Sequence, residues 1–142
     1  MKVVIEPIIR YDGFLEDYTR LIDRAFTELD PMRIDSISIG SVRYRKQLRS
    51  MILKHFPGTS LFAASQELQE PAGNDARMRY SLQERERIYR HMVTAIRKHS
   101  NVPITLGAES SGLWSVVGVT PEGHMGSFVA QFEEEKKKNE GN

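Results

Sequence analysis

Polar residues that could bind a ligand follow three apolar segments of this 142-residue sequence, each where the segment ends. Glu6 ends the first segment, Ser41 and Arg43 follow the second, and Glu109 and Ser110 follow the third. If the segments are parallel strands, their carboxyl ends meet at one edge of a sheet, where α/β proteins bind their ligands. The spacing therefore predicts a ligand site at that edge. The alternative is that these residues only cap the helices that follow the strands.

The chemistry open to the chain is limited by the absence of cysteine. Without thiolates the chain has no cysteine nucleophile and no thiolate-held zinc or iron–sulfur site of its own. The four histidines are scattered, and His91 and His99 lie eight positions apart, which is too far for a metal pair on one helix turn. We therefore predict no metal site, and no catalytic residue can be named from the sequence.

An alternation of strands and helices must position the polar strand ends. The predicted strands are 2–6, 35–39 and 102–106, and the predicted helices are 14–29, 45–56, 81–99 and 113–117. Ser81 and Glu84 have the spacing of a capping box. Segment 67–80 is polar and interrupted by glycine and proline, which indicates a loop. The order of the elements predicts an α/β fold with a parallel sheet and outer helices.

The apolar positions of three helices have the three-and-four spacing of a buried stripe. In the helix 14–29 the stripe includes Leu21, Ile22 and Phe26, and in the helix 45–56 it includes Leu48 and Met51. In the helix 81–99 it consists of Ile88, Met92, Ala95 and Ile96. We expect all three stripes to face the core.

Net charge and hydropathy place the chain among ordinary globular proteins. Formal net charge is +1, from 20 basic and 19 acidic residues, so a domain-wide basic excess typical of nucleic-acid binders is absent. No apolar run reaches the ~18 residues of a membrane span, and the first residues lack a signal-peptide pattern. We expect a cytoplasmic location and no membrane partner.

Four segments together resemble a known enzyme family. IEPIIRYDGFLEDY (5–18), ISIGSVRYRKQL (37–48), MRYSLQERERIYRHM (78–92) and ITLGAES (104–110) are similar, in this order, to the C-terminal half of radical S-adenosylmethionine proteins of the spore photoproduct lyase family. The resemblance implies a partial (βα) barrel, of which residues 1–118 form the last three βα units. Residues 119–142 are then an extension that ends in a partly disordered charged tail.

The resemblance also implies a cofactor site. In the family this half helps to bind S-adenosylmethionine, and the positions that carry over are Glu6, Ser41, Arg43, Glu109 and Ser110. A carboxylate at a strand end can accept hydrogen bonds from a ribose diol or an ammonium group. An arginine there can hold a carboxylate or a phosphate with two hydrogen bonds.

The departures from the family concern its redox chemistry. The CxxxCxxC motif that holds a [4Fe–4S] cluster in the family has no counterpart here, and Glu6 stands where relatives more often have aspartate. Leu106-Gly107-Ala108 precede Glu109-Ser110, where relatives often carry a cysteine and a methionine. We therefore expect a fragment or split half of a lyase that cleaves S-adenosylmethionine reductively and repairs a dithymine-type DNA lesion.

Such a half is expected to be inactive without a partner that supplies the cluster-binding cysteines. The alternative is a non-catalytic module that binds a nucleoside or nucleic acid. Because three parallel strands leave an uncovered edge and face, two copies of the chain could also pair as a homodimer.

Clusters of arginine with an aromatic residue suggest a second binding surface. Arg77, Arg79 and Tyr80 form one cluster, and Arg43-Tyr44-Arg45-Lys46 form another. Cations next to aromatic rings can contact phosphates and stack on bases, so contact with DNA is a hypothesis for the first cluster. The alternative is a solvated face on which Glu84 and neighbouring acidic residues neutralise the charge.

Overall fold

The computed structural model describes residues 1–62, 66–68 and 77–119, and for 66–68 it describes the backbone. The helices and strands are β1 (Lys2–Ile8), α1 (Phe14–Glu28), β2 (Ser36–Ser41), β3 (Arg43–Arg45), α2 (Leu48–His55), β4 (Gln66–Leu68), β5 (Arg77–Tyr80), α3 (Leu82–Arg97), β6 (Ile104–Leu106) and α4 (Ser111–Val116). A short 3₁₀ turn, Pro31–Arg33, lies between α1 and β2. Except for Val119, the predicted extension 119–142 lies outside the described residues, so the division at residue 118 stays a prediction.

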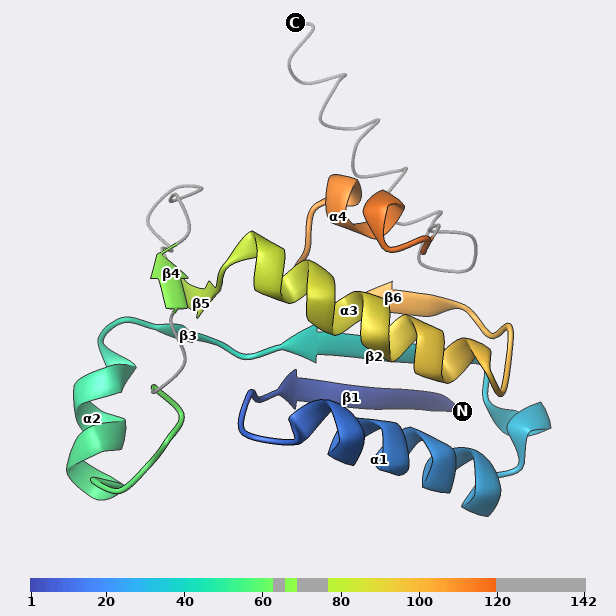
Figure 1. Cartoon of the computed structure of the whole chain (residues 1–142), viewed down its shortest axis with the longest axis horizontal. Coiled ribbons are helices and arrows are strands. Elements are labelled where there is room, and N and C mark those ends of the chain that lie inside the picture. Colours follow the sequence, from blue (N-terminus) through green and yellow to red (C-terminus); the bar gives the residue numbers. More distant parts are fainter. Residues whose placement is uncertain (63–65, 69–76, 120–142) are drawn as a thin grey trace, which may run out of the picture.

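The centre of the fold is a three-stranded parallel sheet in the order β1-β2-β6 (Figure 1). Ile5 of β1 lies opposite Ile39 of β2, and Ile39 lies opposite Leu106 of β6. The predicted α/β class, with parallel strands and outer helices, is confirmed. The three polar strand ends therefore meet at one edge of the sheet, as the sequence predicted.

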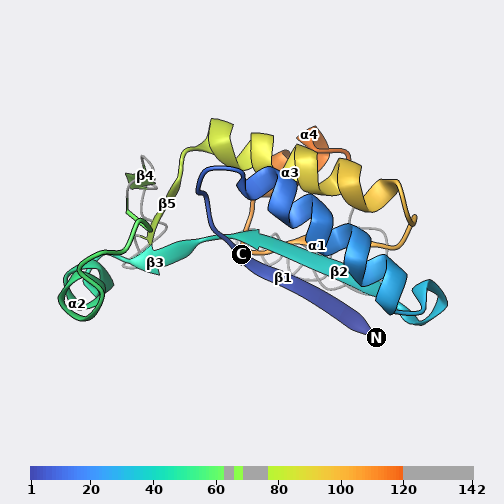
Figure 2. The same cartoon turned by 60° about the horizontal axis from the view of Figure 1, so that its bottom comes forward.

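Helices α1 and α3 pack on the same side of this sheet (Figure 2). Their apolar stripes form the core together with the isoleucines and leucine that alternate along the strands. The predicted inward face of α3 is confirmed, because Ile88, Met92 and Ile96 are fully buried. On α1, Ile22 and Phe26 are buried as expected, but Leu21 is 48% exposed.

Local signals explain where the two packed helices begin. Gly13 precedes α1 with a positive φ of 81°, a conformation that glycine adopts without steric cost. The Ser81 hydroxyl accepts a hydrogen bond of 3.2 Å from the backbone N–H of Glu84 and so caps α3. The Ser81 half of the predicted capping box is therefore present, whereas the Glu84 carboxylate pairs with Arg10 and Arg87.

The segment between β2 and α3 differs from its prediction. Segment 67–80 was expected to be a loop, but β4 overlaps its beginning and β5 forms its end. Strand β5 pairs with both β3 and β4, in an antiparallel sheet of order β3-β5-β4. This second sheet and α2 extend beyond the carboxyl end of β2 (Figure 1). The loop prediction was wrong for 67–68 and 77–80, because the strand β3 that β5 pairs with lies more than 30 residues earlier in the chain, and residues 69–76 lie outside the described part of the chain.

The inward stripe predicted for the second helix was also wrong. None of the residues of α2 is buried, and Leu48 and Met51 are 40% and 56% exposed. Periodicity indicated an amphipathic helix, but the body of the protein does not cover its apolar side.

Candidate functional site

The first part of the site is a carboxylate that lies across two glycines. Three core residues, Ile5, Ile39 and Leu106, lie side by side across the three strands. The residues that directly follow them in the chain are Glu6, Gly40 and Gly107. Because side chains alternate along a strand, Glu6 and the two glycines face the side away from α1 and α3. The backbone N–H of Gly107 donates to the carbonyl of Ile39 at 2.8 Å, which holds the β6 end against β2.

The Glu6 side chain reaches over both glycines. A Cβ placed on Gly40 would lie 2.6 Å from the Glu6 carboxyl carbon and from Oε1, and one on Gly107 would lie 3.0 Å from Oε1. With Glu6 in this position, a side chain on either glycine would displace the carboxylate, so the two positions form a floor on which it rests. We call Glu6, Gly40 and Gly107 the carboxylate ledge.

The ledge presents an accessible anion. Glu6 is exposed, and its carboxylate makes no hydrogen bond or ion pair within the described part of the chain. A carboxylate of this kind can accept hydrogen bonds from hydroxyl or ammonium donors of a ligand. The glycine floor lets the carboxylate itself lie close to the backbone.

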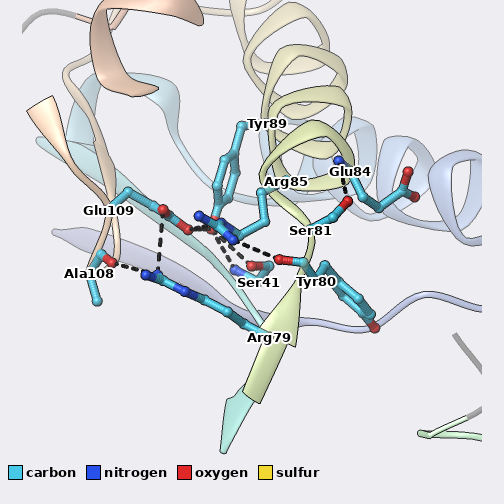
Figure 3. A network of polar contacts seen from close by, with 9 residues as sticks. All are labelled: Ser41, Arg79, Tyr80, Ser81, Glu84, Arg85, Tyr89, Ala108 and Glu109. Carbon is cyan, nitrogen blue, oxygen red and sulfur yellow. Dashed lines mark hydrogen bonds and ion pairs between the residues drawn. The ribbon is translucent and has the colours of Figure 1, made fainter. Parts of the chain in front are cut away.

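The second part of the site lies on the opposite, helix-covered side of the strand ends. Ser41, Tyr89 and Glu109 meet there with Arg85 and Arg79 (Figure 3), and we call these five residues the strand-end network. Arg85 and Glu109 are both 3% exposed at their side chains. The network joins β2, β5, α3 and the segment after β6.

Tyr89 is at the centre of the network. Its hydroxyl accepts a hydrogen bond of 2.9 Å from the backbone N–H of Ser41, and it lies 3.0 Å from Oε1 of Glu109 and 3.1 Å from the Ser41 hydroxyl. Burial raises the pKa of Tyr89 to about 12, and the nearby Glu109 charge adds to that shift. The phenol therefore stays protonated at neutral pH.

Two arginines compensate the buried charge of Glu109. Nε of Arg85 lies 3.1 Å from Oε1 of Glu109, and Nη1 of Arg79 lies 3.6 Å from Oε2. Nη1 of Arg85 also donates to the Tyr80 carbonyl at 2.6 Å, and Nη1 of Arg79 donates to the Ala108 carbonyl at 3.2 Å. Burial lowers the pKa of Arg79, and the charge of Arg85 lowers it further. The pair of arginines thus holds the carboxylate in place.

Ala108 turns the chain so that Glu109 reaches the helix side. Its φ of 52° lies in the left-handed region, which costs a non-glycine residue of the order of 1 kcal/mol. The hydrogen bond from Arg79 to the Ala108 carbonyl helps to hold this conformation.

The five residues carried over from the resemblance fall into separate places. Ser41 and Glu109 meet at Tyr89, whereas Glu6 lies on the other face of the sheet. Arg43 is exposed and lies opposite Arg79 in the β3–β5 pair. Ser110 is exposed at the start of α4, where its side chain makes no capping hydrogen bond. The contacts within the chain neither support nor contradict a ligand-binding role for these five residues, so that role stays a prediction.

The cluster of Arg77, Arg79 and Tyr80 is only partly available to a ligand. Tyr80 is fully buried, and its hydroxyl accepts a hydrogen bond of 2.8 Å from the backbone N–H of Arg10. A ring in this position cannot stack on a base, so Tyr80 is removed from the proposed DNA surface. Arg79 contributes charge there but is also a member of the strand-end network.

Sequence reasoning placed Gly40 at the end of the second strand without recognising its role beneath Glu6, and it missed Arg85, Tyr89 and Gly107 as residues of the site. The signal for Arg85 was available, because it lies on the apolar stripe of α3 with Ile88 and Met92, and a buried arginine needs partners. The two glycines align only through the strand register, which the sequence does not reveal.

The described residues meet neither the requirements of a metal site nor those of a membrane-spanning helix. In residues 1–62 and 77–119, no cluster of three or more metal-binding side chains occurs. None of the helices in the described ranges has the length and apolarity to cross a bilayer.

Comparison with known proteins identifies the fold. No protein-family model and no curated protein matches the sequence. Among solved structures, the chain is similar to spore photoproduct lyase complexed with dinucleoside spore photoproduct (TM-score 0.62), to a variant with bound AdoMet and dinucleoside spore photoproduct (TM-score 0.63), and to a variant with dinucleoside spore photoproduct (TM-score 0.65). Sequence identity is 17% in each case, over 74% of this chain.

The match spans about a third of the length of those proteins, 32% of each chain. At this identity the similarity concerns the fold. The chain thus has the α/β fold of one part of spore photoproduct lyase, as the resemblance in its sequence implied.

Proposed function

We propose that this chain is the cofactor-binding portion of a radical S-adenosylmethionine enzyme of the spore photoproduct lyase type, and that the nucleoside cofactor binds at the carboxylate ledge. The observation that supports the proposal is the position of Glu6. Its exposed carboxylate lies across Gly40 and Gly107 at the carboxyl ends of parallel strands. Ligands of α/β proteins bind at such strand ends.

The chemistry of the ledge suits S-adenosylmethionine. The cofactor carries a ribose diol, an ammonium group and a cationic sulfonium, and each is a donor or a positive charge that a carboxylate attracts. Neutral hydrogen bonds contribute about 1 kcal/mol, whereas those to a charged group contribute about 1.5–3 kcal/mol, so Glu6 would contribute much of the affinity.

The [4Fe–4S] cluster does not fit this chain. Its ligands are thiolates, and the sequence contains no cysteine. In the family that the sequence resembles, S-adenosylmethionine supplies a 5′-deoxyadenosyl radical for repair of a dithymine-type lesion. We propose the same reaction class here only for an assembly, in the cytoplasm, with a cysteine-bearing polypeptide.

Isothermal titration calorimetry with S-adenosylmethionine and S-adenosylhomocysteine tests the proposal on the chain alone. We expect one ligand per chain, with a dissociation constant that rises about tenfold or more in Glu6→Gln, because the variant keeps the shape and loses the charge. Glu16→Gln is the matched control, since Glu16 is an exposed carboxylate on α1, away from the ledge. Absence of binding by the unmodified chain would refute the proposal.

A second candidate function is nucleic-acid binding on the antiparallel sheet. Arg43 lies opposite Arg79 and Arg45 lies opposite Arg77, so four arginines share one face of β3 and β5. Segment 36–62, which includes Arg43 and Arg45, contains five lysines and arginines and no acidic residue. This concentration of charge contrasts with the whole chain, whose net charge is +1. It favours an anionic polymer as the partner.

Fluorescence anisotropy with a labelled single-stranded oligonucleotide tests this second function. The double variant Arg43→Ala/Arg45→Ala leaves the strand-end network intact, unlike a change of Arg79. We expect the slope of log K against log salt to fall by about one for each phosphate that an arginine no longer neutralises. Arg33→Ala/Lys98→Ala is the control, because it removes the same charge from exposed positions elsewhere. Equal effects of both double variants would argue against a specific surface.

A further inference from the structure

The Tyr89 hydroxyl holds the last peptide of β2. Its oxygen accepts the backbone N–H of Ser41 at 2.9 Å, and this bond spans 48 residues of sequence. Ser41 is the residue directly after Gly40, which is the part of the floor closest to Glu6. The orientation of the peptide between them therefore depends on a side chain from α3.

The direction of the hydrogen bonds can be assigned from chemistry. A phenol has one proton, and the carboxylate of Glu109 can only accept, so Tyr89 donates to Glu109 across 3.0 Å. The Tyr89 oxygen is then an acceptor for both the N–H and the hydroxyl of Ser41. Because burial raises the pKa of Tyr89 to about 12, this arrangement persists at neutral pH.

The position of the phenol is fixed from several elements at once. Arg85 of α3 and Arg79 of β5 hold Glu109, and the Ala108 turn brings Glu109 toward α3. The Tyr89 side chain is itself fully buried. A rotation of the phenol would therefore break its contacts to Ser41 and to a Glu109 carboxylate that the two arginines hold.

We propose that Tyr89 is a positioning residue for the carboxylate ledge: it fixes the Gly40–Ser41 peptide, and thereby the floor on which Glu6 meets its ligand. The network and the ledge lie on opposite faces of the sheet, so Tyr89 does not touch the ligand. Its effect on affinity rests on the proposed function, whereas its effect on the β2 end does not.

Tyr80 provides a matched control for the experiment. Both tyrosines are fully buried, and each hydroxyl accepts one backbone N–H, that of Ser41 for Tyr89 and that of Arg10 for Tyr80. Tyr89→Phe and Tyr80→Phe thus remove the same atom and, in each case, a hydrogen bond from a backbone N–H. Tyr89→Phe also removes the contacts to Glu109 and to the Ser41 hydroxyl, and it alone releases a peptide that belongs to the ledge.

Two readouts separate positioning from general stability. Hydrogen exchange followed by NMR reports protection of the Ser41 amide without any ligand, and calorimetry with S-adenosylhomocysteine reports affinity. We expect Tyr89→Phe to raise Ser41 exchange at least tenfold and to weaken ligand binding about tenfold. Tyr80→Phe should leave both unchanged even where urea unfolding shows a similar loss of stability.

Unchanged Ser41 protection in Tyr89→Phe would overturn the proposal, as would equal changes at Ser41 in both variants. If the unmodified chain binds no S-adenosylhomocysteine, the proposed function fails, but the exchange experiment still decides whether Tyr89 fixes the β2 end. If Tyr89→Phe does not fold, Ser41→Ala removes only the hydroxyl contact of 3.1 Å. That variant should then keep the Ser41 amide protected, and loss of protection there would contradict the assigned role of the Tyr89 oxygen.

Discussion

Replacement of Gly40 by alanine should separate ligand binding from folding. The added Cβ would lie 2.6 Å from the carboxyl carbon and Oε1 of Glu6, whereas ordinary contacts begin at 3.4 Å. The Glu6 carboxyl group must therefore move by about 1 Å, a displacement that can cost a positioned group much of its effect. The backbone of Gly40 has no positive φ that would strain alanine.

The expected magnitude follows from the bond that is removed. A hydrogen bond to a charged group contributes about 1.5–3 kcal/mol, so the dissociation constant for S-adenosylhomocysteine should rise by about tenfold or more. The free energy of unfolding should change by less than about 1 kcal/mol, because the displaced atoms are the mobile end of an exposed side chain and alanine costs less backbone entropy than glycine.

Alanine variants at three glycines should affect ligand binding to different degrees. Gly107→Ala meets Glu6 at 3.0 Å and should weaken binding less than Gly40→Ala, and Gly58→Ala meets nothing within 4 Å and should have no effect. Calorimetry measures affinity, and urea unfolding measures stability in each variant. Unchanged affinity in Gly40→Ala, or the same loss in all three variants, would refute the account of the ledge.

Three further predictions concern the buried network and the helix cap. Glu109→Ala leaves Arg85 buried without its carboxylate and should lower the free energy of unfolding by about 3–5 kcal/mol in urea titrations; a loss below about 1 kcal/mol would mean that the pair is not buried. The folded-state pKa of Tyr89 is raised from 10 to about 12, so its contribution to stability is complete below pH 10 and is lost as pH rises toward 12. Two pKa units correspond to about 3 kcal/mol, and Tyr89→Phe should lack this part of the alkaline decline; equal declines in both proteins would contradict the shift. Ser81→Ala removes the cap of α3 and should cost about 1 kcal/mol in thermal or urea unfolding, while an unchanged stability would show that the cap contributes nothing.

The parts of the fold that follow from local pattern could be predicted from the sequence. The first two strands and the buried face of α3 at Ile88 and Met92 follow from a β-branched run, from alternation and from helical periodicity, although β1 continues past Glu6 to Ile8. Strand β5 could not be predicted, because short polar strands form only through pairing with a distant segment.

The candidate site was only partly within reach of sequence reasoning. Glu6 and Glu109 were identified as strand-end carboxylates, but the structure places them on opposite faces of the sheet. A register difference of one residue decides the face, and the turn at Ala108 redirects Glu109. Tyr89 was missed because a tyrosine on an apolar stripe has the pattern of an ordinary core residue.

The central claim is that a nucleoside ligand binds on the carboxylate ledge. It is tested most directly by a ¹⁵N-resolved NMR titration of the chain with S-adenosylhomocysteine, in which the amides of Gly40 and Gly107 report on the floor beneath Glu6. We predict saturable shifts of both amides in the unmodified chain and their loss in Glu6→Gln at the same ligand concentrations. Shifts confined to other residues, or shifts of the two glycines that persist unchanged in Glu6→Gln, would contradict the claim.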